Sequence, residues 1–264
     1  QAQTVNGGTK KDAEAILNSS LNLLGEKYGG SATAPLLWKP IGTTDNVYQG
    51  NFDGNQKTIS QMKVEQEGYA GLFGCAGGGA VIKGLGLYTT CSVTASGTAG
   101  GDGAAAFVGT VKSDGVTEKQ ITIQNCYNRA SVTGKTGMTG AFIGNYEGTT
   151  GAGTQQISNC YTTGRITTSS GTPGAIAGAF TNGNGGGIKY CYWNKETSNS
   201  SDLNAVGSGG DAAVEESRAM TTTEMNTATA DGTGGLLENL NKGAGGNGWV
   251  RSVMRNDGYP IFTA

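Results

Sequence analysis

The stretch that decides the fold is Gly71-Leu72-Phe73-Gly74, because near copies of it return at regular intervals along the chain. Each copy has a small residue, two apolar residues and a closing glycine. The further copies are Ala106-Phe107-Val108-Gly109, Ala141-Phe142-Ile143-Gly144 and Ala175-Ile176-Ala177-Gly178. Their closing glycines are 35, 35 and 34 residues apart. Self-similarity at a fixed period is typical of repeat architectures.

A second signature of the form Ile-x-x-apolar accompanies the first. Its copies are Ile59…Met62, Ile82…Leu85, Ile123…Cys126, Ile157…Cys160 and Ile188…Cys191. The last members differ in size but not in polarity, as neighbours in a core do. We therefore predict that one interior column contains Met62, Leu85, Cys126, Cys160 and Cys191. Methionine and leucine in that column count against a cysteine metal site.

Each repeat is too short and too poor in apolar residues to bury a core alone, but stacked repeats would bury a continuous one. Short β-prone segments such as Gln120–Ile123, Ala130–Thr133 and Arg165–Thr168 lie between polar, glycine-rich stretches. The chain has 48 glycines, which suit tight corners. We predict an all-β fold, a right-handed parallel β-solenoid (β-helix), with an antiparallel sandwich as the weaker alternative.

The two ends differ from the repeats. Apolar residues in Lys11–Leu24 follow helical spacing, which predicts an amphipathic helix. A second helix is expected within Thr221–Asn226 or Gly235–Leu240. The predicted division is an N-terminal cap over 1–34, the repeat solenoid over 35–195, and a C-terminal loop and cap over 196–264.

Composition excludes several classes of function. The 264 residues include 18 basic and 20 acidic ones, for a net charge of −2, and no long basic run appears. A groove that tracks nucleic-acid phosphates is therefore disfavoured. The absence of histidine removes His-based triads and imidazole metal sites. No apolar run is long enough to span a membrane.

The five cysteines cannot all pair within one chain, and none forms a Cys-x-x-Cys motif. We predict buried, unpaired thiols, with one Cys75–Cys91 disulfide as the alternative. No metal site and no cofactor are predicted.

Three tyrosines recur next to the cysteine column, at Tyr127, Tyr161 and Tyr192. If the cysteines point inward, the neighbouring tyrosines point outward. The outward rings have two interpretations. They could form a ladder that stacks on sugar rings or packs against a partner, or they could lie beneath a loop of the same chain.

The acidic residues do not assemble a catalytic pattern, and no catalytic residue is predicted. Phe52-Asp53-Gly54-Asn55 is interpreted as a tight turn rather than a calcium or acid site. The carboxylates of the middle repeats fall in different phases of the repeat, at Asp102, Asp114, Glu118 and Glu147. Two arginines also differ in phase, because alignment of Val132 with Ile166 places Ser131, not Arg129, opposite Arg165.

These motifs resemble the GLUG repeats (Gly-Leu-variable-Gly) of bacterial surface proteins. Trp38-Lys39-Pro40-Ile41-Gly42, the Asn-Cys-Tyr copies and the closing Asn256-Asp257-Gly258-Tyr259-Pro260 fit the same pattern over about residues 36–195 and the end of the chain. Only the first copy keeps the full motif, and Gln56 stands where a second glycine is common. The resemblance implies a scaffold or adhesive element.

The expected function is accordingly that of an exported bacterial surface protein, non-enzymatic, with an adhesive or scaffold-like role through multivalent contact along a repeat face. Its partner would be an extracellular glycan or protein. The chain begins with Gln1 rather than Met, which we interpret as the product of a removed export signal. The alternatives are a carbohydrate-active hydrolase or lyase on the same scaffold, and a structural module beside a catalytic domain.

Overall fold

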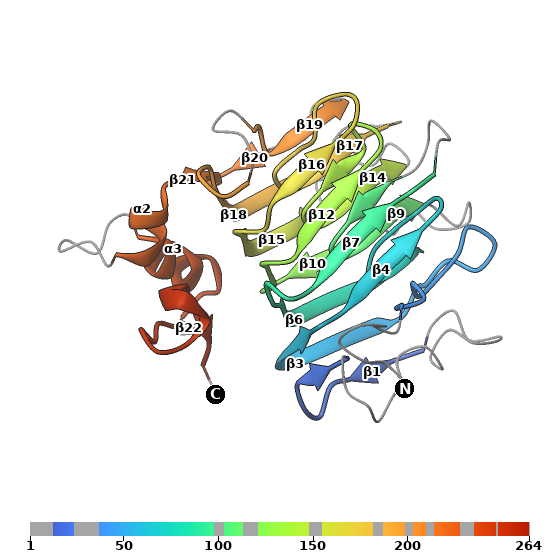
Figure 1. The fold of residues 1–264 in the computed structure, drawn as a ribbon. Coiled ribbons are helices and arrows are strands. Elements are labelled where there is room, and N and C mark those ends of the chain that lie inside the picture. The colour runs from blue at the N-terminus through green and yellow to red at the C-terminus, as the bar shows by residue number, and fades with distance from the viewer. Residues whose placement is uncertain are drawn as a thin grey trace.

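The computed structural model describes residues 13–23, 37–97, 103–112, 121–147, 155–181, 187–198, 203–209, 214–227, 235–246 and 248–263. The fold is all-β with mostly parallel sheets (Figure 1). The predicted all-β class is confirmed, and the parallel pairing rules out the antiparallel sandwich. Within the described residues, no helix is both long and apolar enough to cross a membrane.

Three parallel sheets form the body. Sheet A contains β1 (Ala15–Ile16), β2 (Leu21–Asn22), β3 (Asn51–Ser60), β6 (Val81–Leu87), β10 (Thr122–Gln124), β11 (Tyr127–Asn128), β15 (Gln155–Thr162), β18 (Gly187–Asn194), β20 (Val214–Glu215) and β21 (Arg218–Met220). Sheet B contains β4 (Lys63–Gln66), β7 (Ser92–Ala95), β12 (Ser131–Gly134) and β16 (Ile166–Thr168). Sheet C contains β5 (Phe73–Gly77), β9 (Val108–Lys112), β14 (Ile143–Glu147), β17 (Ala177–Phe180) and β19 (Val206–Gly209).

The smaller elements complete the fold. A short parallel pair joins β8 (Ala104–Ala105) to β13 (Thr139–Gly140). The C-terminal segment, which is residues 221–263 as described, follows β21. It contains helices α2 (Thr222–Asn226) and α3 (Leu236–Gly243), the 3₁₀ turn η2 (Asn256–Gly258), and an antiparallel pair of β22 (Trp249–Val250) with β23 (Ile261–Phe262). Both places where a second helix was expected are therefore helical.

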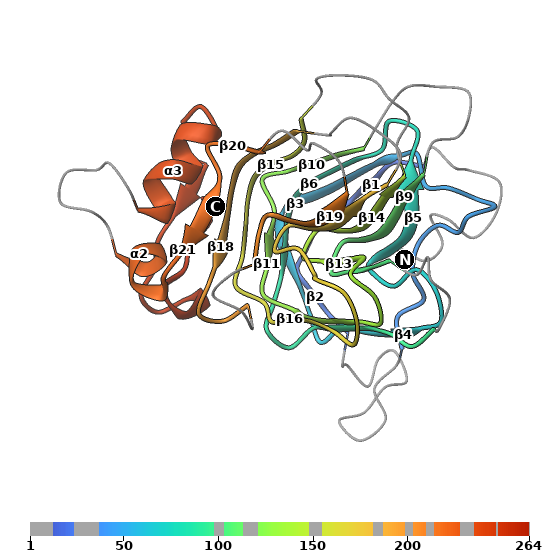
Figure 2. The ribbon, with the colours of Figure 1, turned by 90° about the horizontal axis from the view of Figure 1, so that it is seen from above.

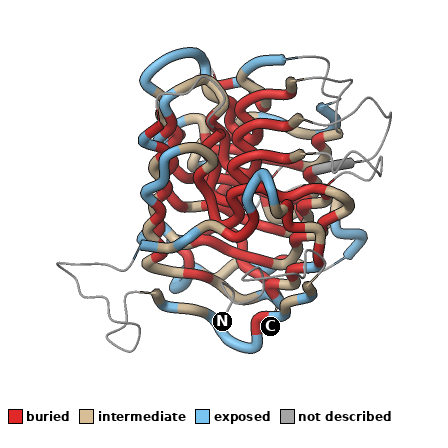
Figure 3. Tube along the Cα trace, turned by 90° about the vertical axis from the view of Figure 1, so that its right-hand side faces the viewer, coloured by how far each residue is buried: buried red, intermediate tan, exposed pale blue. Residues whose placement is uncertain are grey.

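The three sheets enclose one core, as the view along the stack shows (Figure 2). The chain passes through the sheets in turn, so that like positions of successive repeats pair. One inward column of sheet A contains Phe52, Ile82, Ile123, Ile157, Ile188 and Val214. Buried segments are stacked through the length of the molecule (Figure 3).

The cysteines lie in the next inward column of sheet A. Cys160 pairs with Cys191, and the pairing of Tyr127 with Tyr161 places Cys126 beside Cys160. The pairing of Tyr127 with Gly86 places Leu85 beside Cys126. Leu85 and all three cysteines are fully buried.

Met62 does not belong to this column, and that part of the prediction is wrong. The register between β3 and β6 shifts between Asp53 and Lys57, which places Lys57 opposite Leu85. Two extra residues of β3 thus move Met62 around the corner toward sheet B. There its carbonyl accepts a hydrogen bond from Ser92 N, one residue after Cys91. Met62 is buried as predicted, but beside Cys91.

The closing glycines of the four motif copies stack in sheet C, where backbone fills the space that a side chain would need. A Cβ on Gly178 would lie 2.1 Å from Thr139 N, and one on Gly144 would lie 2.4 Å from Ala104 N. The same column has two further members. Ile41 pairs with Phe73 and Val206 with Ala177, which adds Gly42 and Gly207. The close approach explains why the motif ends in glycine.

The predicted N-terminal helix is wrong over the described residues 13–23. There the chain forms β1 and β2, which both pair with β3 in sheet A. Pairing with an existing sheet edge overrides weak helical spacing in so short a segment. The parallel sheets thus run from Ala15 to Met220, beyond the predicted bounds of 35–195. The division into three parts stays a prediction.

Candidate functional site

The three tyrosines that could have formed a binding ladder point away from the main core but are not on the surface. Tyr127 pairs with Tyr161, and Tyr161 pairs with Tyr192. Their exposed fractions are 1%, 0% and 3%. The C-terminal segment lies over this part of sheet A, with α2 and α3 beside β18 (Figures 1 and 2). An exposed tyrosine ladder is therefore wrong, and the alternative of rings covered by the same chain is confirmed.

Aromatic side chains of the C-terminal segment pack directly on the ladder. The rings of Tyr127 and Tyr161 stack with centroids 5.3 Å apart. Trp249 lies edge-on to Tyr161 at 5.8 Å, and Phe262 contacts Tyr127 at 5.4 Å. Met220, Met225, Leu236 and Leu240 complete this second core. The arrangement buries large aromatic surfaces on both sides, which stabilises the docked segment.

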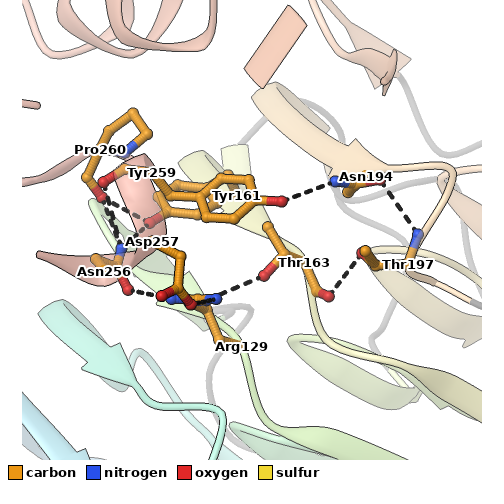
Figure 4. A network of polar contacts seen from close by, with 9 residues as sticks. All are labelled: Arg129, Tyr161, Thr163, Asn194, Thr197, Asn256, Asp257, Tyr259 and Pro260. Atoms are coloured by element: carbon orange, nitrogen blue, oxygen red, sulfur yellow. Dashed lines mark hydrogen bonds and ion pairs between the residues drawn. The ribbon is translucent and has the colours of Figure 1, made fainter. Parts of the chain in front are cut away.

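Arg129 is the centre of a polar network at the edge of that second core (Figure 4). Its guanidinium donates to Asn256 Oδ1 at 2.8 Å and to Asp257 Oδ2 at 2.6 Å. Nε donates to Thr163 Oγ1 at 3.3 Å, and the group lies 5.0 Å from the centroid of the Tyr259 ring. The side chain is only 8% exposed, so its charge is neutralised by fixed partners rather than by water.

The closing motif that the sequence singled out supplies most of these partners. Asn256, Asp257 and Gly258 all have positive φ, near 54°, 51° and 81°. Asparagine, aspartate and glycine tolerate this conformation best, which explains their choice at this sharp turn. The turn presents Asn256 Nδ2 to Tyr161 Oη at 2.8 Å. Tyr161 Oη in turn donates to the Pro260 carbonyl at 2.6 Å.

A second arm of the network reaches the end of β18. Asn194 Nδ2 donates to Tyr259 Oη at 3.1 Å and to Thr222 Oγ1 at 2.9 Å. Its Oδ1 accepts from the backbone N–H groups of Glu196 and Thr197, and Thr197 Oγ1 donates to the Thr163 carbonyl. Sequence reasoning missed Asn194. Asn194 lies three residues after Cys191, as Arg129 does after Cys126, and this shared place after the Cys-Tyr pairs is the signal that could have found it.

This network holds the segment in place and has no reactive group free. Burial raises the pKa of the Tyr161 hydroxyl well above its usual value, so the group stays protonated. Arg129 and Asn194 are committed to the partners just described. Aromatic packing, a buried cation and matched hydrogen bonds together form a docking site for the molecule's own C-terminal segment.

The outward face of sheet B is different, because its side chains are exposed or half-exposed and repeat in register. Val93 pairs with Val132 and Val132 with Ile166, all pointing inward. The alternate positions point outward in two parallel rows. One row contains Lys63, Ser92, Ser131 and Arg165, and the other contains Glu65, Thr94, Thr133 and Thr167.

These rows are polar and mostly short-chained. Thr133 Oγ1 and Thr167 Oγ1 lie 3.1 Å apart, so the hydroxyls of neighbouring repeats are within hydrogen-bond distance. Lys63 and Glu65 form an ion pair of 2.8 Å at the first strand. Neighbouring strands in a sheet lie about 4.8 Å apart, so equivalent side chains along each row follow one another at about this spacing. A regular surface of this kind can offer the same contact several times to one ligand.

The acidic residues considered for catalysis are separate from each other in the described structure. The tight turn predicted at Phe52-Asp53-Gly54-Asn55 is wrong, because these residues lie within β3, at the point where its register with β6 shifts. Asp53 accepts a hydrogen bond from Asn55 N at 2.7 Å and pairs with Lys83 at 3.2 Å. Glu147 pairs with Lys112 at 3.7 Å and accepts from Asn145. Asp102, Asp114 and Glu118 lie outside the described residues. The two described members of this set, Asp53 and Glu147, are thus each paired with a lysine of their own.

All five cysteines are free and buried, and the Cys75–Cys91 disulfide is wrong. Burial raises the pKa of Cys75 to about 12 and that of Cys91 to about 11. Burial likewise raises the pKa of Cys160 well above its usual value. Among the described residues, no group of three or more His, Cys, Asp or Glu side chains could hold a metal ion. The thiols therefore act as small apolar side chains.

The comparisons with known proteins bear on the fold. No protein-family model matches the sequence, and no curated protein matches it. Among solved structures, the chain is similar to the crystal structure of a "putative immunoglobulin A1 protease" from Bacteroides ovatus. The TM-score is 0.55 at 18% sequence identity, over 96% of this chain and 86% of the other. At this identity the likeness shows a shared fold alone.

Proposed function

We propose that this chain is an exported bacterial surface protein whose GLUG-type repeats form a right-handed parallel β-solenoid, and that it binds an extracellular glycan or protein through the outward face of sheet B. Its role would be adhesive or scaffold-like. Binding would be multivalent along the repeats, with no bond made or broken. Three kinds of observation support this proposal.

The order of the strands supports the solenoid. From β3 to β17 the chain visits sheets A, B and C in turn, and each visit pairs parallel with the visit one repeat earlier. The closing glycines stack on one another in sheet C, as do Cys126, Cys160 and Cys191 in sheet A. In sheet B the inward Val93 stacks on Val132. Stacking of equivalent residues from repeats of nearly equal length is how a solenoid builds its core.

The observation that carries the binding proposal is the pair of outward rows on sheet B. Thr94, Thr133 and Thr167 are aligned by backbone register, and none of them is buried. The tyrosine ladder, in contrast, is taken up by the C-terminal segment. A rigid row presents its hydroxyls without a large loss of side-chain entropy on binding, because short side chains have few rotamers to lose.

The same observations favour a binding role over catalysis. The chain has no histidine, and its five thiols are buried. Burial raises the pKa values of Cys75, Cys91 and Cys160. A glycosidase would use two carboxylates beside one bond, and the described Asp53 and Glu147 are each paired with a lysine. The Bacteroides ovatus structure is named a protease, and proteolysis is therefore a further alternative for this chain. It is no more than that, since fold does not imply function.

Binding and turnover should be measured on one sample of the full chain. A glycan array and immobilised extracellular glycoproteins would serve as binding probes. Reducing-sugar release and proteolysis of the same probes would report turnover. We expect retention of at least one probe with no product formed. Product formation that a single Asp or Glu substitution abolishes would contradict the proposal, and so would failure to retain any glycan or protein probe.

A further inference from the structure

The ends of the stack are left open among the described residues. The C-terminal segment packs beside sheet A, over the tyrosine ladder, and does not lie across either end (Figures 1 and 2). β1 and β20 are the two outermost strands of sheet A, and β19 is an outermost strand of sheet C. No described strand pairs with their outer edges. Such edges present unpaired backbone N–H and C=O groups that favour association.

Three of the six large apolar side chains that are exposed in the described structure lie at these two ends, and the other three lie within residues 250–254. At the first end, Ile16 of β1 is 63% exposed and Leu37, which pairs with Lys63 of sheet B, is 45% exposed. At the last end, Val214 of β20 is 43% exposed. Val214 closes the inward column whose preceding member, Ile188, is fully buried. The hydrophobic core therefore reaches the surface at the last strand.

The edge strands also lack the residues that usually prevent pairing. Natural edges are often protected by lysine, by proline or by an unpaired inward charge. β1 is Ala15-Ile16, and β19 reads Val-Gly-Ser-Gly. The charge in β20 is Glu215, which is neutralised by Lys189 of the neighbouring strand at 3.1 Å.

The two ends are complementary rather than alike. All pairs in sheets A, B and C are parallel, so a second copy shifted along the stack would present its β1 to β20 in the same direction. The column that ends in Val214 begins with Ala15, which pairs with Phe52. The same register would place Ile16 of one copy opposite Glu215 of the other. A contact between two unlike surfaces does not close on itself, and it produces open chains of molecules.

We infer that copies of this chain associate head-to-tail, with β20 of one copy pairing with β1 of the next. The partner is a second copy because it carries the matching strand direction, the matching inward column and an exposed apolar residue in its edge strand. A net charge of −2 gives little repulsion between copies. This association is independent of the ligand that sheet B is proposed to bind.

Sedimentation velocity of the full chain over a wide range of concentrations tests the inference. The wild type should form species that lengthen with concentration. Ile16→Glu places a second carboxylate opposite Glu215 of the next copy, and Val214→Lys places a charge at the end of the inward column. Each should raise the dissociation constant about tenfold or more. Val253→Lys and Val253→Glu are the matched controls, because Val253 is 82% exposed and lies three residues before Asn256, which contacts Arg129 and Tyr161 of the middle repeats.

A mixture of the two blocked variants separates the possible arrangements. Ile16→Glu keeps a free last end and Val214→Lys keeps a free first end. Each should be monomeric alone, and together they should form a dimer and nothing longer. If either variant dimerises alone as strongly as the wild type, the contact joins like ends and the inference is wrong. A wild type that stays monomeric at every concentration would also overturn it.

Register can be tested without added charge, in case a charged variant does not fold. Ile16→Cys mixed with Glu215→Cys should form an intermolecular disulfide under mild oxidation, because the inferred register places these positions opposite each other. Ile16→Cys mixed with Val253→Cys should not. Equal cross-linking in both mixtures would contradict the head-to-tail contact.

Discussion

The hydroxyl of Tyr161 donates a 2.6 Å hydrogen bond to the carbonyl of Pro260, which lies 99 residues further along the chain. This bond joins the middle of the repeat array to the last strand of the protein. It also explains why an aromatic column on the outside of sheet A is not a binding surface, since the chain's own end occupies it.

Removal of this hydroxyl should loosen the C-terminal segment. Tyr161→Phe leaves the buried Asn256 amide and the Pro260 carbonyl with fewer partners, which should cost about 1–2 kcal/mol. Hydrogen exchange of the described residues within 221–263 should become faster, while the parallel sheets stay protected. Tyr190→Phe is the control, because no described residue forms a hydrogen bond with the Tyr190 hydroxyl. Equal effects of both substitutions would show that the Tyr161 bond does not hold the segment.

The closing glycines should not tolerate a methyl group. Gly178→Ala would place a Cβ 2.1 Å from Thr139 N, and backbone on both sides resists displacement. We expect a loss of about 1–3 kcal/mol in the free energy of unfolding, measured by chemical denaturation. Gly246→Ala is the matched control, because nothing lies within 4 Å of the added Cβ there. An unchanged midpoint for Gly178→Ala would mean that the close approach is absent in solution.

The repeats could be read from the sequence because of these same contacts. A position where no Cβ fits keeps its glycine while the polar stretches around it change, so the spacing of 34 to 35 residues stays visible. Gly42 and Gly207 were not assigned to this column, because they stand 32 and 29 residues from Gly74 and Gly178 instead of 34 to 35. The parallel stacking of Cys126, Cys160 and Cys191 followed from the same regular spacing.

The errors have physical causes that a sequence pattern does not contain. Met62 shares its motif with the column residues, but the register shift after Asp53 moves it to another wall of the core. The segment over 13–23 has helical spacing, yet a free edge of sheet A was available for strand pairing. The cover over Tyr161 depends on contacts between residues 95 to 128 positions apart. Local propensity says nothing about such contacts.

The thiols should be inert in the folded protein. Burial raises the pKa of Cys91 to about 11 and that of Cys75 to about 12, so little thiolate forms near neutral pH, and no reagent reaches the core. We expect no reaction with a water-soluble disulfide reagent in the native state and five equivalents after unfolding. Fast labelling of the native protein would contradict the buried column.

Acid should weaken the start of α2. Glu224 accepts from Thr221 N at 2.6 Å and from Arg218, which lowers its pKa from 4.5 to about 2. A lowered folded-state pKa means that the stabilisation is present above 4.5 and is lost as the pH falls through about 2. Glu224→Gln keeps the capping geometry but loses the charge. At 42% exposure the loss should be about 0.5 kcal/mol near neutral pH.

The comparison of wild type and Glu224→Gln should be made by denaturation at several pH values. The difference between the two proteins should shrink as the pH falls from 4.5 toward 2. A difference that stays constant over this range would assign the effect to packing instead of charge.

The most direct test of the account is whether ligand binding maps to the outward rows of sheet B. Thr94→Arg and Thr133→Arg would place long side chains on the central strands of that face, and Val253→Arg would place the same side chain on an exposed loop elsewhere. Binding to the glycan or glycoprotein probe that retains the wild type should be measured for all three variants. We predict that both threonine variants lose affinity about tenfold or more and that Val253→Arg binds normally. Wild-type affinity in both threonine variants would contradict the assignment of sheet B as the binding face.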